Sequence, residues 1–374
     1  MNGFDLEIIS VEGQGGMPYH SYLLDTKSLV IVIDTGIDMM RGRFEELLKK
    51  RDLEAKRLLV LNTHGHWDHI ALNGWLKKKY GAVIMAHPGD GWIMNDFDTA
   101  LEVAYKKHQD LFPLTKEFLE FISKNLSYPK GPDETLADGD TVEDEDFCLR
   151  VVATPGHSEG SVSFFEENTR TLFSGDALQG NGQNGNAPIY NDAESYLQSV
   201  DILDALQPEN IYQGHRITEG REACQTLIDE SREACVFIDE YLAEHYGGNA
   251  ESLQTVAESL SALRGWKNGM HLASSIDAHK PFSIEPTSLK EPEPEPEPAA
   301  GPEFAFDAPP IPSFDDFSFD APPVPSFDDF SFDAPPIPSF DAPEAPPVPS
   351  FDNFSFDDMP PIPSFDDTGE QDDK

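Results

Sequence analysis

Four side chains that commonly bind metals lie within six residues, directly after a short apolar run. The apolar run is Leu58–Asn62, and the motif HGHWDH that follows contains His64, His66, Asp68 and His69. Several imidazoles and a carboxylate are costly to remove from water together unless they bind a cation. The motif therefore requires a fold in which the end of a buried strand delivers these groups to a metal site.

Other polar residues complete two sets of ligands. In extended backbone, side chains two residues apart point to the same side, so His64 and His66 can share one cation. Asp68 and His69 begin the next predicted helix and point elsewhere, which suits a second cation nearby. Three further candidates follow predicted strands, each beside a glycine that lets the backbone pass close to a crowded centre. They are His157 in TPGHSEG, Asp176 in FSGDAL and His215 in YQGHR.

The surrounding sequence alternates between strand and helix patterns. Leu29–Asp34 and Leu58–Asn62 are largely apolar, as expected for strands that are buried on both faces. Helical patterns over Met39–Lys50 and Ala71–Tyr80 follow these two strands. This alternation predicts an α/β layered domain.

With these motifs, the sequence resembles the metallo-β-lactamase superfamily over residues ~5–220. The resemblance implies an αββα sandwich with two metal ions at one edge, between two sheets. Asp34 in VIDTG matches the position in the family that orients metal ligands. Carried over position by position, the first metal would be held by His64, His66 and His157, the second by Asp68, His69 and His215, and Asp176 would bridge the two.

The resemblance implies a metal-dependent hydrolase in which two cations share a hydroxide. Two cations ~3.5–4 Å apart generate this nucleophile at neutral pH and polarise a carbonyl or phosphoryl oxygen. Asp68 would orient the hydroxide and take its proton, besides binding metal. The nitrogen-rich ligand set suits zinc best, and iron or manganese also fit.

The pattern is closest to that of the hydroxyacylglutathione hydrolases, which implies a small ester, thioester or lactone substrate. None of the three cysteines lies in a ligand motif, which argues against the best-known β-lactamase branch. Two alternatives stay open: a phosphodiesterase of the same fold, and a persulfide dioxygenase with a single iron on His64, His157 and Asp176. Tyr190, just beyond a Gly/Asn-rich loop, is a candidate for hydrogen bonding to a substrate oxygen.

The resemblance, together with composition and periodicity, divides the chain into three regions. We expect a hydrolase domain over residues 1–247, with a helical insertion at about 98–127, and a C-terminal helical extension over residues 248–290. The insertion could cover the binding site or simply add packing to a sheet face. Residues 291–374 hold 22 of the 69 acids, 21 of the 31 prolines and one base. Proline and like-charge repulsion predict a disordered acidic tail with Phe/Pro repeats.

Charge limits the partners that we expect. The chain has a formal net charge of −43, of which the tail carries −21 and residues 1–290 carry −22. Clustered Lys and Arg supply most of the affinity for phosphate backbones, so this balance argues against nucleic acid. The spaced Phe residues of the tail could instead anchor a protein partner. No signal peptide and no apolar run of membrane-spanning length is present, so we expect a cytoplasmic protein.

Overall fold

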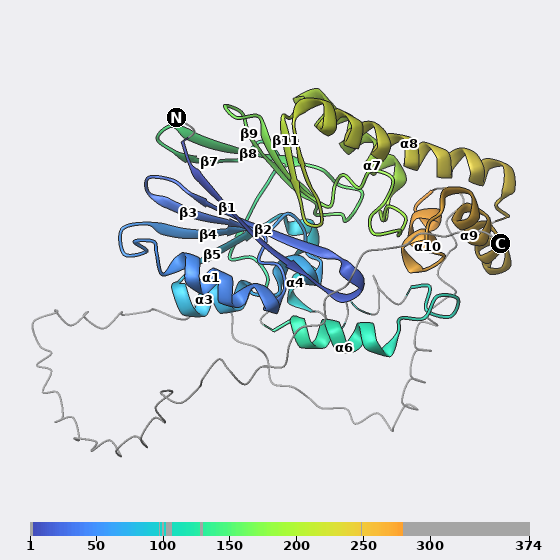
Figure 1. Cartoon of the computed structure of the whole chain (residues 1–374), viewed down its shortest axis with the longest axis horizontal. Coiled ribbons are helices and arrows are strands. Elements are labelled where there is room, and N and C mark those ends of the chain that lie inside the picture. Colours follow the sequence, from blue (N-terminus) through green and yellow to red (C-terminus); the bar gives the residue numbers. More distant parts are fainter. Residues whose placement is uncertain are drawn as a thin grey trace, which may run out of the picture. The chain divides into compact units, whose positions relative to one another are not determined.

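Two six-stranded sheets lie face to face in the described part of the chain (Figure 1). The computed structural model describes residues 3–96, 98, 101, 107–127, 130–247 and 249–279. The strands of the first sheet, in spatial order, are β1 (Asp5–Glu12), β2 (Pro18–Asp25), β3 (Leu29–Ile33), β4 (Arg57–Leu61), β5 (Val83–Ala86) and β6 (Glu134–Thr135). Those of the second are β12 (Ile217–Glu219), β11 (Asn210–Gln213), β10 (Thr171–Gly175), β9 (Val162–Glu166), β8 (Phe147–Ala153) and β7 (Thr141–Asp144).

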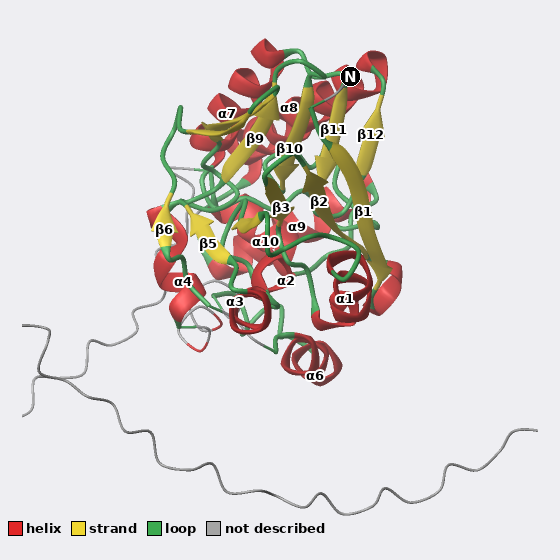
Figure 2. Cartoon of the chain, turned by 90° about the vertical axis from the view of Figure 1, so that its left-hand side faces the viewer, coloured by secondary structure: helices red, strands yellow, loops and turns green. Residues whose placement is uncertain are grey.

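Helices cover the outer face of each sheet (Figure 2), and two more pack against the helices of the second sheet (Figure 1). The helices on the first sheet's side are α1 (Arg41–Leu48), α2 (Trp67–Ile70), α3 (Asn73–Tyr80), α4 (Gly91–Asn95) and α6 (Lys116–Asn125). On the second sheet's side lie α7 (Ala193–Leu206) and α8 (Arg221–His245), and the helices that pack against α8 are α9 (Ala250–Arg264) and α10 (Met270–Asp277).

Strand β3 shows why the layers form. Its five residues are all buried, and alternate side chains point to opposite faces of the sheet. Leu29, Ile31 and Ile33 pack in the core between the two sheets, whereas Val30 and Val32 pack with the residues of α1 and α3. An apolar run of this length therefore needs cover on both sides. The predicted αββα sandwich is confirmed.

Several strands end at the same edge of the sandwich. Strands β3 and β4 are parallel, and so are β10 and β11. A hydrogen bond joins the two sheets there. The amide of Val162 donates it to the carbonyl of Thr63 at 2.8 Å. The segments that follow these strands therefore meet at one edge, where the sequence motifs lie.

The predicted regions outside the sandwich differ in how far the structure describes them. Helix α6 lies in the predicted insertion, and the side chain of Thr115 caps it by accepting a hydrogen bond from the amide of Phe118 at 3.1 Å. Helices α9 and α10 lie in the predicted C-terminal extension. The predicted tail, residues 291–374, lies outside the described residues. Among the described residues, no helix is both long and apolar enough to cross a bilayer.

Candidate metal centre

Three imidazoles converge at the shared edge of the two sheets. His64 Nε2 lies 3.0 Å from His66 Nδ1, and His157 Nε2 lies 3.2 Å and 2.9 Å from the same two atoms. Nitrogens that ligate one tetrahedral zinc ion at 2.0–2.1 Å are about 3.3 Å apart. The three nitrogens are thus spaced as ligands of a single cation.

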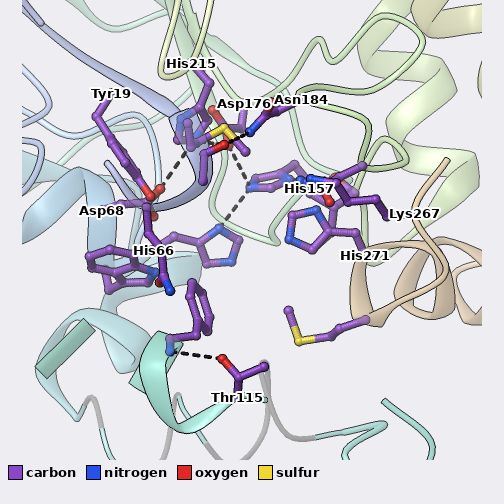
Figure 3. Close-up of a pocket in the computed structure, with 18 of the residues that line it drawn as sticks. Tyr19, His66, Asp68, Thr115, His157, Asp176, Asn184, His215, Lys267 and His271 are labelled. Atoms are coloured by element: carbon purple, nitrogen blue, oxygen red, sulfur yellow. Dashed lines mark hydrogen bonds and ion pairs between the residues drawn. The ribbon is translucent and has the colours of Figure 1, made fainter. Parts of the chain in front are cut away.

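A second set lies beside the first and shares a carboxylate with it. Asp68 Oδ2 is 3.2 Å from His215 Nε2 and 4.0 Å from His69 Nε2. Asp176 Oδ2 lies 3.4 Å from His215 Nε2 and 3.7 Å from His157 Nε2, and its Oδ1 lies 3.7 Å from His69 Nε2. Asp176 is therefore within reach of ligands from both sets (Figure 3).

Hydrogen bonds on the outer side of the rings fix which nitrogen faces inward. His157 Nδ1 donates to the carbonyl of Ile189 at 2.7 Å, and His215 Nδ1 donates to the carbonyl of Pro18 at 2.7 Å. A carbonyl can only accept, so each of these rings carries its proton on Nδ1. The Nε2 lone pair then points into the site, as a metal ligand requires.

Asp34 contacts a third ring in the same way. Its Oδ2 lies 2.8 Å from His69 Nδ1 and 2.7 Å from the hydroxyl of Thr63, and its Oδ1 accepts from the Thr63 amide at 2.8 Å. Asp34 also has a positive φ of 53°, a conformation that asparagine and aspartate tolerate better than most residues. Asp34 thus contacts the Nδ1 side of the His69 ring, and its role in orienting a metal ligand stays a prediction.

Burial and nearby charges shift the imidazole pKa values of the two ligand sets in opposite directions. Burial lowers the pKa of His66 and His157 to about 4 and that of His64 well below its usual range, so these rings are neutral at pH 7. Burial opposes a charge on His69 too, but the carboxylates of Asp34, Asp176 and Asp68 outweigh it and raise the His69 pKa to about 9. The second set therefore lies in a strongly negative field, which divalent cations would neutralise.

Two buried polar atoms point into the centre without a hydrogen-bond partner among the described residues. They are His69 Nε2 and Asp176 Oδ1, both with almost no exposed surface. A buried polar atom without a partner costs about 1–3 kcal/mol, and more when it is charged. Metal coordination would satisfy both atoms. The donor set, five imidazoles and two carboxylates, fits zinc best and also suits iron or manganese.

A glycine next to His215 permits this crowding. A Cβ atom at Gly214 would lie 2.4 Å from the His69 ring and 2.7 Å from Asp176 Oδ1, far inside contact distance. The expectation that glycines let the backbone approach the centre is confirmed at this position.

The centre opens into a cavity of about 490 Å³ (Figure 3). His66, Asp68, His157, Asp176 and His215 line one side of it. The opposite side comes partly from the C-terminal extension and the Gly/Asn-rich loop. The polar residues contributed there include Asn184, Lys267 and His271.

The prediction for Tyr190 is wrong. Its side chain is fully buried, stacks on Tyr196 with ring centres 4.6 Å apart, and hydrogen-bonds through its hydroxyl to His279 at 2.9 Å. It packs among the helices of the second sheet and is absent from the residues that line the cavity. Tyr19 lines the cavity instead (Figure 3). Burial and the charges of Asp68 and Asp176 raise the Tyr19 pKa, so its hydroxyl stays protonated.

Asp90 holds together the two loops that carry the first set. Its Oδ2 accepts from the Gly65 amide at 2.8 Å and from the Ser158 hydroxyl at 2.6 Å, and its Oδ1 accepts from the Gly160 amide at 2.7 Å. The side chain is 1% exposed. Gly65 lies between His64 and His66, and Ser158 follows His157, so Asp90 sets the distance between these ligands.

Three imidazoles at the centre, one buried and two partly buried, predict that the metal-free protein loses stability in mild acid. His66, His157 and His271 each have a folded-state pKa of about 4, lowered chiefly by burial. At these three sites the unfolded chain binds more protons than the folded chain between pH 6.5 and 4, so their contribution to stability falls as pH falls. His69 and His215, whose pKa values are raised by nearby carboxylates, act in the opposite direction and offset part of this loss. We expect about 1 kcal/mol less unfolding free energy per imidazole at pH 5.5 than at pH 7.

Urea denaturation in EDTA at the two pH values measures this difference. His271→Gln should reduce it by about 1 kcal/mol, whereas His245→Gln, at an exposed ring, should leave it unchanged. Equal stability at pH 5.5 and pH 7 would contradict the prediction.

The fold and the clustered side chains define the class of protein: an αββα sandwich with a group of His and Asp residues that could hold metal ions at the edge between its sheets. A family model described as the metallo-beta-lactamase superfamily matches residues 15–215, more than half of the chain. The chain belongs to this superfamily.

Individual relatives are distant. The chain is 23% identical over 270 residues to a beta-lactamase-like protein 2 homolog from Caenorhabditis elegans, covering 72% of this chain and 74% of that protein. It is 26% identical over 258 residues to the atrochrysone carboxyl ACP thioesterase of Aspergillus fumigatus, covering 66% and 68%. It is 27% identical over 194 residues to a hydroxyacylglutathione hydrolase from Brucella anthropi. That match covers 51% of this chain and 58% of the enzyme, which is less than two thirds of the enzyme's length.

Among solved structures, a metallo-beta-lactamase family protein from Thermus thermophilus is similar with a TM-score of 0.57 at 21% identity. The similarity covers 72% of this chain and 91% of that one. At this identity the likeness supports the fold alone.

Proposed function

We propose that the protein is a dinuclear metal-dependent hydrolase that cleaves a small ester or thioester, as hydroxyacylglutathione hydrolases do. The observation that carries this proposal is the pair of adjacent ligand sets that share Asp176 and open into a cavity. His64, His66 and His157 would hold one cation, and Asp68, His69 and His215 the other.

Two cations in these sets would supply a hydroxide nucleophile at neutral pH and polarise the carbonyl oxygen of the substrate. Asp68 lines the cavity and has a pKa of about 2, because His69 and His215 outweigh the effect of burial. As a carboxylate it can orient the attacking water and accept its proton. Tyr19 keeps its proton and can donate a hydrogen bond to a substrate oxygen.

The cavity wall and the relatives both favour an ester or thioester. Two of the relatives are named as a thioesterase and a hydroxyacylglutathione hydrolase. Lys267 and His271 line the side of the cavity opposite the ligands and can hydrogen-bond a polar thiol or alcohol leaving group. Residues 1–290 carry a net −22, which would repel a polyanionic substrate.

Kinetics with two substrates test the proposal. We expect the zinc-loaded full chain to hydrolyse S-lactoylglutathione with a higher kcat/KM than bis(p-nitrophenyl) phosphate. Asp68→Asn should lower kcat roughly 10²-fold, because a positioned proton acceptor contributes that much. Asp146→Asn, at an exposed carboxylate on the β7–β8 turn, is the matched control and should leave kcat unchanged.

Other outcomes would assign a different reaction. A preference for the phosphodiester would make the protein a phosphodiesterase of this fold. One bound iron ion, with oxygen consumption on glutathione persulfide and no hydrolysis, would make it a persulfide dioxygenase. Full activity after complete removal of metal by a chelator would contradict the proposed role of the ligand sets.

A further inference from the structure

A second hollow of about 460 Å³ adjoins the cavity of the metal centre. The two share four lining residues, Thr115, Phe118, Asn186 and Met270. We call this second hollow the side groove. Because its walls continue those of the cavity, a molecule bound at the ligand sets can extend into it.

The side groove differs from the metal cavity in charge. Its apolar wall residues are Leu111, Phe112, Pro113, Leu114, Phe118 and Met270. The other described residues that line it are Thr115, Asn186, Asn268 and Gly269, so none of them is charged. The metal cavity, by contrast, contains Asp68, Asp176 and Lys267. A substrate that fills both hollows would place its charged groups in the metal cavity and an uncharged part in the side groove.

The walls of the side groove are anchored in both halves of the sandwich. Leu111 and Phe112 pack against the core beneath the helices of the second sheet, whereas Leu114 and Phe118 pack against the core beneath the helices of the first. The insertion thus spans the two halves beside the metal edge. The sequence left open whether it covers the site or adds packing, and here it does both.

An ion pair and a helix cap hold these walls in place. Lys107, at the start of the continuously described part of the insertion (residues 107–127), pairs with Asp277 at the end of α10, whose side chain is 1% exposed. Thr115 caps α6 at the amide of Phe118, which fixes the first turn where Phe118 faces the groove. Both walls are therefore built from packed elements with defined contacts.

We propose that the side groove binds the apolar acyl chain of the substrate. This inference rests on the proposed function and names its substrate class: an ester or thioester with an acyl chain of several carbons. In a thioester with a polar thiol, the thiol part needs hydrogen-bond partners, and Asn184, Lys267 and His271 in the metal cavity provide them. The uncharged groove then remains for the acyl chain, and burying each methylene there strengthens binding up to roughly four-fold.

Binding of two thioethers tests the proposal without any catalysis. S-methylglutathione and S-octylglutathione share the polar thiol part, cannot be hydrolysed, and differ only in the chain. We expect calorimetry on the zinc-loaded full chain to show at least ~10-fold tighter binding of the octyl compound. In kinetics, kcat/KM should likewise rise at least ~10-fold from S-acetylglutathione to S-octanoylglutathione.

Matched substitutions locate the effect. Leu114→Asn should lower kcat/KM for S-octanoylglutathione much more than for S-acetylglutathione, and should weaken octyl binding much more than methyl binding, which removes most of the chain-length preference. Leu263→Asn, at a side chain that is 62% exposed on α9, is the control and should preserve the preference. Circular dichroism of both variants checks that they fold, and Met270→Gln provides a second groove variant from the other wall.

The outcomes separate this inference from the proposed function. Hydrolysis of S-acetylglutathione that is lost in Asp68→Asn, together with no preference for longer chains, would overturn the acyl groove and keep the hydrolase. No hydrolysis of any thioester would overturn the proposed function, and tighter octyl binding sensitive to Leu114→Asn would still support the groove. Equal preference in wild type and in both groove variants would place the apolar chain elsewhere and overturn the inference.

Discussion

Asp176→Asn should reduce the protein from two bound metal ions to at most one and lower kcat/KM roughly 10³-fold or more. The side chain is 7% exposed, and its two oxygens lie 3.4–3.7 Å from imidazole nitrogens of both ligand sets. Asparagine preserves the shape but removes the negative charge, and it replaces one oxygen by an NH₂ group that cannot ligate. The two cations would then repel each other without a shared counter-charge.

Metal analysis by mass spectrometry and steady-state kinetics measure this result. Asp146→Asn removes an equal charge from an exposed turn and should keep two ions and full activity. Two ions and normal turnover in Asp176→Asn would sink the assignment of Asp176 as the bridge. A loss of activity with both ions retained would instead give Asp176 a role in positioning substrate.

Local patterns in the sequence account for most of the fold and for the seven ligand candidates. A strand such as β3 can be predicted from the sequence, because five consecutive apolar residues need cover on both faces of a sheet. The candidate ligands in the HGHWDH motif can be recognised in the sequence because they are neighbours in the chain. His157, Asp176 and His215 could be placed because each follows a strand, and the strands that precede them end at one edge of the sandwich.

Residues whose role depends on long-range placement could not be found in this way. Tyr19 and His271 reach the cavity from opposite ends of the described chain, and nothing in their immediate sequence marks them as polar groups of a site. Tyr190 is the opposite case, a residue that its place in the sequence suggested but that lies away from the cavity. It lies next to the Gly/Asn-rich loop in sequence, but its side chain turns into the packed helices, where Tyr196 and His279 contact it.

Asp90 is the clearest case, because its three hydrogen-bond partners lie 25 to 70 residues away in the chain. In the sequence it is one acid in the segment HPGDGW, with the appearance of an ordinary turn residue. Only the folded structure brings the two ligand loops onto the same carboxylate. A Cβ atom at Gly160 would lie 2.4 Å from the Asp90 backbone nitrogen, so this contact also requires glycine there.

Asp90→Ala should lower the free energy of unfolding by about 3–5 kcal/mol. The substitution leaves the amides of Gly65 and Gly160 and the hydroxyl of Ser158 without their acceptor in a buried region. Because these groups flank His64, His66 and His157, the first cation should also bind roughly 10–100-fold more weakly, as when groups that orient metal ligands are removed. Urea denaturation and competition with a zinc chelator measure the two effects separately.

Glu166→Ala provides the matched control. Glu166 is also 1% exposed, and it accepts hydrogen bonds from the amide and the hydroxyl of Thr169 at 2.7 Å and 2.6 Å. It ends β9, at the opposite end of these strands from the metal edge. We therefore expect a comparable loss of stability with unchanged zinc affinity. If both variants weaken zinc binding equally, the effect of Asp90 comes from general destabilisation. If only Asp90→Ala does so, the carboxylate sets the spacing of the first ligand set.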